Sequence, residues 1–132
     1  MSPASPTKMP PNSLDASGAT YTASVVGALS GVLTGLGHGV DNLTVNAAAS
    51  NVGLIGSNTG TVRDIGVTDA VVDGVGNTGG LVGWNGGAVR NAWASATVSG
   101  SASGDNTGGL VGWNAGTVDN SFATGAASGR FY

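Results

Sequence analysis

The chain has 132 residues, of which 25 are glycine, none is cysteine and only 8% are charged, with a formal net charge of −3. A globular enzyme carries charges at about a quarter of its positions, and a chain without cysteine has neither a disulfide framework nor thiolate-ligated metal. The negative net charge offers no basic surface for nucleic acid. Disorder is not implied, because Val, Leu and Ile recur at regular places.

Residues 1–20 are predicted to form an extended arm or linker. All four prolines lie between Pro3 and Pro11, and proline-rich segments are extended. The arm has one Lys and no apolar run, unlike a signal peptide. Nowhere does the chain approach the roughly 20 apolar residues that span a bilayer, so we expect no membrane insertion.

The main part of the chain contains an internal repeat. The sequence NTGGLVGWNGGAVRN at 77–91 returns as NTGGLVGWNAGTVDN at 106–120, and a weaker copy, NVGLIGSNTGTVRD, occupies 51–64. A half copy, GHGVDNLTV, is assigned to 37–45. The last aligned position of the four copies is Asn or Asp, at Asn42, Asp64, Asn91 and Asn120.

Period-two alternation after each of these positions predicts strands with one buried face. Gly and Asn clusters between the strands predict turns. No helix is expected beyond residue 40, while a short helical turn within 22–36 stays open.

Short strands in copies whose Asn/Asp positions are 22, 27 and 29 residues apart predict an all-β fold. It is a short parallel β-solenoid of the right-handed β-helix type, with about three to four turns, over residues 21–129. Successive turns stack about 4.8 Å apart, so equivalent residues form columns. The expected interior columns are Val62/Val89/Val118, Leu54/Leu81/Leu110 and Val45/Val67/Ala94/Ala123.

Two sets of Asn and Asp are predicted to form structural ladders. Amides stacked at an inside bend can bond to each other and satisfy polar groups that cost about 1–3 kcal/mol each when buried unpaired. Glycines are expected at corners with positive φ or where no Cβ fits. The two ladders are Asn42, Asp64, Asn91 and Asn120, and Asn58, Asn85 and Asn114.

Four aromatic residues are candidates for contact with a ligand or partner. Trp93 faces outward if the alternating alanines beside it face inward, and Phe122 follows it in the next turn of the coil. Trp84 and Trp113 share a second column, whose direction stays open because both neighbouring apolar residues compete for the interior. Exposed aromatics stack on sugar rings or on protein.

No catalytic or cofactor-binding motif is recognised. GVGNTG at 74–79 matches Gly-x-Gly-x-x-Gly, but that motif needs a following helix, and a strand is predicted there. His38 is the single histidine, and a zinc protease needs a second one and a Glu. Asp69, Asp73 and Asp105 offer one weak calcium site or, more commonly, cap turns. We therefore expect no enzyme activity, no metal and no cofactor.

Two further features, a possible carboxylate pair and a glycosylation sequon, do not indicate a functional site. Asp41 and Asp64 are placed in adjacent columns, where a carboxylate pair could cleave glycans, but the sequence supplies no basic or aromatic cleft around them. Asn42-Leu43-Thr44 is a formal glycosylation sequon, which the assigned ladder position of Asn42 accounts for without modification.

GGLVGWNGGAVRNAWASATVSG and GGLVGWNAGTVDNSFATGAASG strongly resemble the GLUG repeat, whose core is G-L-V-G-aromatic-N-x-G-x-V/I-x-N. The likeness covers roughly residues 27–129. It implies a place in large bacterial surface proteins, namely filamentous haemagglutinin-like adhesins and IgA-specific metallopeptidases, in which these repeats form non-catalytic extracellular stalks. Architecture carries over, at Leu81, Val82, Trp84, Asn85, Val89 and Asn91 and their counterparts in the next copy.

The expected function is that of an extracellular or cell-surface structural and adhesive module. It is a stalk segment of an adhesin or a filament subunit that associates end to end through its strand edges, with residues 130–132 as a short tail. The alternative is a glycan-binding or host-surface-binding module that uses the outward aromatics.

Overall fold

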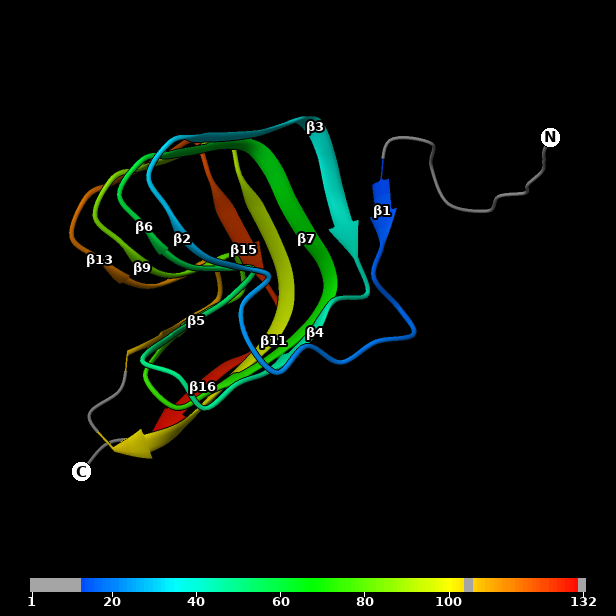
Figure 1. Cartoon of the computed structure of the whole chain (residues 1–132), viewed down its shortest axis with the longest axis vertical. Helices are drawn as coiled ribbons and strands as arrows, with labels where there is room; N and C mark the ends of the chain where they lie inside the picture. The colour runs from blue at the N-terminus through cyan, green and yellow to red at the C-terminus, as the bar shows by residue number, and fades with distance from the viewer. Residues whose placement is uncertain (1–12, 104–105, 131–132) are drawn as a thin grey trace, which may run out of the picture.

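A computed structural model describes residues 13–103 and 106–130. All regular structure within these residues is β-strand, and the paired strands are parallel. They wind into a β-solenoid of about four turns (Figure 1). The predicted all-β parallel solenoid is confirmed, whereas most of the expected arm and the end of the expected tail lie outside the described residues.

Each turn of the coil is here called a rung; the second, third and fourth rungs pass through three sheets, and the first passes through two. The first rung contains β2 (Val26–Leu29), β3 (Val32–Asp41) and β4 (Thr44–Asn46), with β1 (Ser13–Asp15) paired to the end of β3. The second contains β5 (Asn51–Val52), β6 (Ile55–Asn58) and β7 (Thr61–Gly74). The third contains β8 (Asn77–Gly79), β9 (Val82–Asn85), β10 (Ala88–Arg90) and β11 (Trp93–Ser103). The fourth contains β12 (Thr107–Gly108), β13 (Val111–Asn114), β14 (Thr117–Asp119), β15 (Phe122–Thr124) and β16 (Ala127–Arg130).

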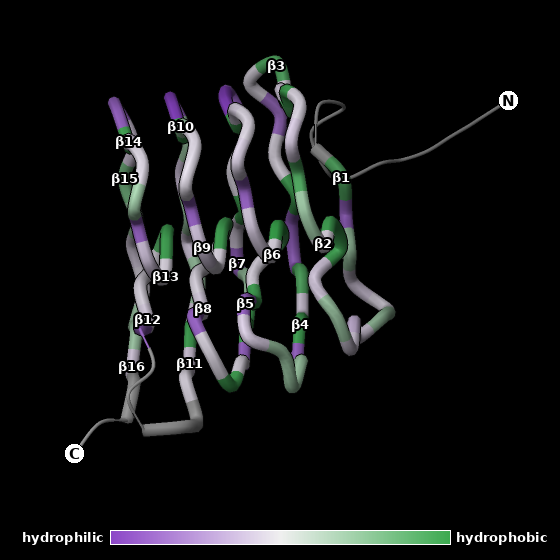
Figure 2. Tube along the Cα trace, turned by 60° about the vertical axis from the view of Figure 1, so that its left-hand side comes forward, coloured by the Kyte–Doolittle hydropathy of each residue, from purple (hydrophilic) through white to green (hydrophobic). Residues whose placement is uncertain are grey.

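Two small sheets meet at an angle, and a long curved sheet wraps around them. The small sheets are β5-β8-β12 and β2-β6-β9-β13; the long sheet, called the outer sheet below, holds the nine remaining strands. In Figure 1 the chain runs clockwise from β6 over the top to β7 and back, while later rungs lie farther from the viewer. The coil is therefore right-handed, the usual sense for connected parallel strands. Figure 2 shows the rungs side by side.

Two of the three predicted apolar columns are present. Val62 pairs with Val89, which pairs with Val118, and in the first rung Leu33 completes the column. The leucine column is held by backbone bonds from the Ile55 amide to the Leu81 carbonyl and from the Leu81 amide to the Leu110 carbonyl. Identical side chains thus lie over one another, as the repeat indicated.

The third predicted column is wrong in its first member. Val67, Ala94 and Ala123 stack on Val40, whereas Val45 pairs with Val72. The predicted alignment of the half copy at 37–45 is therefore wrong by five residues, since Val40 pairs with Val67 and not with Val62. The true counterparts of residues 61–63 are residues 32–34.

Strands β2 and β3 occupy most of 22–36, so no helical turn is present there. Leu81 and Val82 are both fully buried. The chain passes at this point from one small sheet to the other, and consecutive side chains therefore both enter the interior.

The repeat glycines allow the two small sheets to touch through their backbones. A Cβ built on Gly83 would lie 2.5 Å from the Val52 nitrogen and 2.8 Å from the Asn77 oxygen. β9 therefore packs directly against the backbone of the β5-β8-β12 sheet. Gly27 occupies the same column in the first rung, where a Cβ would meet nothing within 4 Å. Close packing, rather than positive φ, thus accounts for the glycine at this position.

Candidate functional site

A buried amide ladder runs through three rungs. The Nδ2 of Asn58 donates to Oδ1 of Asn85 at 2.8 Å, and the Nδ2 of Asn85 donates to Oδ1 of Asn114 at 2.8 Å. Each Oδ1 also accepts from the amide of the glycine two residues later, for example Gly87 at 3.2 Å from Asn85. These backbone contacts fix the orientation of each side-chain amide, so the ladder has a direction.

A second ladder, not among those predicted from the sequence, is formed by Asn51, Asn77 and Asn106. The Nδ2 of Asn106 donates to Oδ1 of Asn77 at 2.9 Å, and the Nδ2 of Asn77 donates to Oδ1 of Asn51 at 2.9 Å. Its donors point towards the N-terminal rungs, opposite to those of the Asn58-Asn85 ladder. The signal was available, because Asn opens each of the three aligned copies.

The predicted ladder of Asn42, Asp64, Asn91 and Asn120 is corrected in two ways. All four have positive φ, between 48° and 60°, and none is buried. They form outer corners rather than an inside bend, because Asn and Asp tolerate the left-handed conformation better than other side chains. One rung-to-rung bond exists among them, from Asn91 Nδ2 to Asp64 Oδ1 at 3.2 Å.

Asn42 also belongs to a different column. Its amide bonds to the Thr68 carbonyl, which places it beside Asp69, another residue with positive φ. Its side chain donates to Oδ1 of Asp15 at 3.1 Å. The Ser17 amide donates to the same Asp15 oxygen at 3.0 Å, and these bonds, with Ser17 the larger cause, lower the pKa of Asp15.

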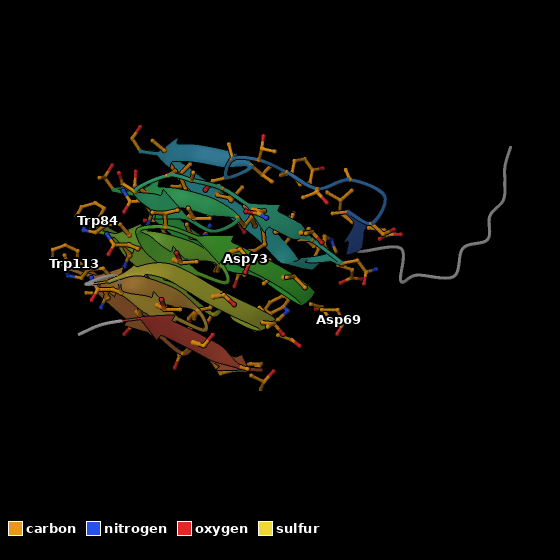
Figure 3. The ribbon with its side chains drawn as sticks, turned by 90° about the horizontal axis from the view of Figure 1, so that it is seen from below. Asp69, Asp73, Trp84 and Trp113 are labelled. Carbon is orange, nitrogen blue, oxygen red and sulfur yellow. The ribbon has the colours of Figure 1, made fainter. Side chains whose placement is uncertain are left out.

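The aromatic column of Trp84 and Trp113 faces outward, which answers the question left open by the sequence. Trp84 pairs with Trp113 on one side and with Ser57 on the other. Trp84 is half-buried, while Trp113 is 51% exposed. Figure 3 shows the two rings next to each other, away from Asp69.

The second aromatic column lies on the outer sheet. Trp93 pairs with Phe122 and with Gly66, and its indole covers Gly66 and Gly39, leaving no room for a Cβ on Gly66. The alanines on either side of Trp93 are buried, so its outward direction is as predicted. Phe122 is 63% exposed. The four aromatics are thus divided between two sheets and do not converge on one site.

The described residues hold no group of three or more His, Cys, Asp or Glu that could bind a metal. Asp41 pairs with Thr68 and with Asp15, not beside Asp64, so the suggested carboxylate pair is wrong. His38 is exposed on β3. Residues 77–79 form a strand, so the Gly-x-Gly-x-x-Gly match lacks its helix. Asp105 lies outside the described residues.

The two ends of the described stack differ. At the N-terminal end, residues 13–21 lie over part of the first rung: β1 pairs with the end of β3, and Tyr21 bridges to Val45. An apolar cavity of about 180 Å³ lies beneath them, with Leu33, Val40 and Leu43 in its wall. At the other end the fourth rung has no described strand on its far side.

Comparison with family models, with curated proteins and with solved structures gave no match to this chain. Within the described residues there is no helix long and apolar enough to cross a membrane.

Proposed function

We propose that this chain is a non-catalytic structural module of a bacterial cell surface, a segment of an adhesin stalk or a subunit that assembles into a filament. The observation that carries the proposal is the continuity of its columns: apolar side chains and buried amides stack rung on rung through the fold. The GLUG resemblance supports the same role and the extracellular location.

Rung-on-rung stacking suits a spacer, because each rung contacts only its neighbours and stability grows with each added unit. The buried side chains are valine, leucine, isoleucine, alanine, the paired amides of Asn58 and Asn85, and Thr78. Such an interior makes the solenoid rigid and allows it to be lengthened by adding rungs. The outward-facing side chains can vary without any change in this core.

The test is to insert a second copy of residues 77–105 after residue 105. A modular spacer accepts the extra rung, so its stack lengthens by about 4.8 Å and its free energy of unfolding increases. Small-angle X-ray scattering and urea denaturation measure the two effects. A control inserts the same 29 residues in shuffled order. Loss of cooperative unfolding with the true repeat would contradict the proposal.

A second candidate function is glycan binding by the outward aromatics, favoured by the exposure of Trp113 and Phe122. Flat rings on a β-sheet can stack on sugar rings. A glycan array followed by titration of Trp113→Ala and Phe122→Ala tests it. Because the two rings lie on different sheets, each substitution tests a separate surface. Binding that survives both substitutions excludes both surfaces, and no binding to the array excludes this function for the sugars presented.

A further inference from the structure

The C-terminal end of the described stack exposes the cross-section of the core. Within the described residues, the strands of the fourth rung pair only with the third rung. Leu110, Val111 and Val118 are half-buried there and Ala123 is exposed, whereas their third-rung counterparts are at most 1% exposed. Unpaired strand edges over apolar side chains are a template for pairing with another chain.

A second copy stacked head to tail does not fit this end well. At the N-terminal end, the Ala16 amide bonds to the Asp41 carbonyl and Tyr21 bridges Val45. These contacts occupy part of the strand edge of the first rung. In a head-to-tail stack, the second half of another copy's fourth rung would have to pair with that same edge. Furthermore, Leu29 stands in the Asn58 column of the first rung, so it offers no side-chain acceptor to Asn114.

The C-terminal end is complementary to itself. The Nδ2 of Asn114 makes one hydrogen bond within the described residues, to the Gly116 carbonyl at 3.3 Å. By contrast, the Nδ2 of Asn85 donates to Oδ1 of Asn114 and to the Thr117 carbonyl in the following rung. The Oδ1 of Asn106 accepts no bond from a described residue. Because the two ladders run in opposite directions, the C-terminal end of the stack presents both a donor, the Nδ2 of Asn114, and an acceptor, the Oδ1 of Asn106.

The spacing of these groups is symmetric. Asn106 and Asn114 lie four residues before and four residues after Leu110, the residue at which the chain passes from one small sheet to the other. A two-fold axis through Leu110 therefore places Asn106 of each copy opposite Asn114 of the other copy, which gives two equivalent pairs.

We propose that this end binds a second copy of the chain tail to tail. β12 of one copy pairs with β13 of the other in antiparallel orientation, and the half-buried apolar residues of both fourth rungs close one continuous core. Such an isologous contact, with the same surface on both sides, is the commonest form of self-association. The inference rests on the proposed structural role and specifies its partner and register. Because residues 13–21 cover part of the first rung, this contact joins chains in pairs and does not extend them into a filament.

The first test is sedimentation equilibrium of Ala123→Lys against Val32→Lys. Ala123 lies on the C-terminal end, and Val32, 64% exposed, lies in the first rung. We expect wild type and Val32→Lys to dimerise with similar affinity, and Ala123→Lys to weaken dimerisation at least tenfold while remaining folded by circular dichroism. A wild-type chain that stays monomeric at millimolar concentration, or equal weakening by both substitutions, would overturn the proposal.

The second test uses the absence of native cysteine. On a two-fold axis between antiparallel strands, the two Leu110 Cα atoms would lie about 4.5–5.5 Å apart, within the range that a disulfide bridges. Leu110→Cys should therefore form covalent dimers on mild oxidation, and the control Val25→Cys should not. If the chains instead stack head to tail, a mixture of the two variants would form a disulfide between Leu110→Cys and Val25→Cys. That result would refute the tail-to-tail register. Neither result alters the outcome of inserting a repeat, so the two proposals fail separately.

Discussion

Replacement of Asn85 by alanine is expected to be among the most damaging single changes to the fold. Asn85 is fully buried, and its amide is bonded on both sides. Four of its bonds are 3.2 Å or shorter: with Asn58 at 2.8 Å, Asn114 at 2.8 Å, the Thr117 carbonyl at 3.0 Å and the Gly87 amide at 3.2 Å. Alanine removes all four bonds and leaves the Asn58 and Asn114 side chains with contacts to backbone groups only, such as Asn58 Nδ2 to the Ala88 carbonyl at 3.2 Å and the Gly116 amide to Asn114 Oδ1 at 3.2 Å.

The magnitude follows from these contacts. A net contribution of about 1 kcal/mol for each hydrogen bond gives a loss of roughly 4 kcal/mol in the free energy of unfolding. Small domains are stable by about 5–15 kcal/mol, so this loss would remove much of the stability of the chain.

Urea denaturation followed by tryptophan fluorescence measures this loss. The matched control is Asn91→Gly, which keeps an easy positive φ at an exposed corner and removes one side-chain bond of 3.2 Å; we expect a loss below about 1 kcal/mol. If Asn85→Ala costs no more than Asn91→Gly, the buried ladder does not stabilise the stack and the reasoning fails.

Three more predictions test the local geometry. Gly83→Ala should destabilise the fold by several kcal/mol because its Cβ would collide with the backbone, whereas Gly27→Ala in the same column should be neutral or stabilising by about 0.4–1 kcal/mol; thermal unfolding of the pair decides. Asn120→Val should cost about 1–2 kcal/mol, since a β-branched residue resists its φ of 48°, and an unchanged midpoint in urea would contradict that. Asp15 has a lowered pKa because it accepts the Ser17 amide, so its charge stabilises the N-terminal segment above the ordinary value of 3.8 and this contribution is lost as pH falls through the lowered pKa. The Ser17 amide proton resonance should report that transition by NMR, and Asp15→Asn should abolish it.

The repeated letters were sufficient to predict the parallel stack, one valine column and one leucine column, because each rung must fit its neighbour. The first rung was misaligned, since it has extra residues at the corner around Leu36 and Gly37, where φ is positive. Repetition alone cannot locate such an insertion, because the altered copy no longer matches.

The two kinds of asparagine could not be separated by repetition either, because Asn suits both a left-handed corner and a buried amide. A local feature does separate them. Asn58, Asn85 and Asn114 are each followed two residues later by glycine, whose backbone their amides contact, whereas Asn91 is followed by Ala-Trp. The packing of Gly83 against the neighbouring sheet was not predictable from one strand, since it depends on where another sheet lies.

The opposed directions of the two asparagine ladders have an electrostatic consequence for long stacks. In an α-helix the peptide dipoles add along the axis and leave partial charges at both ends. Here the side-chain amide dipoles of Asn58 and Asn85 point one way along the solenoid and those of Asn77 and Asn106 point the other way. Their fields therefore oppose each other, and copying the rung many times would extend the rod without accumulating charge separation between its tips.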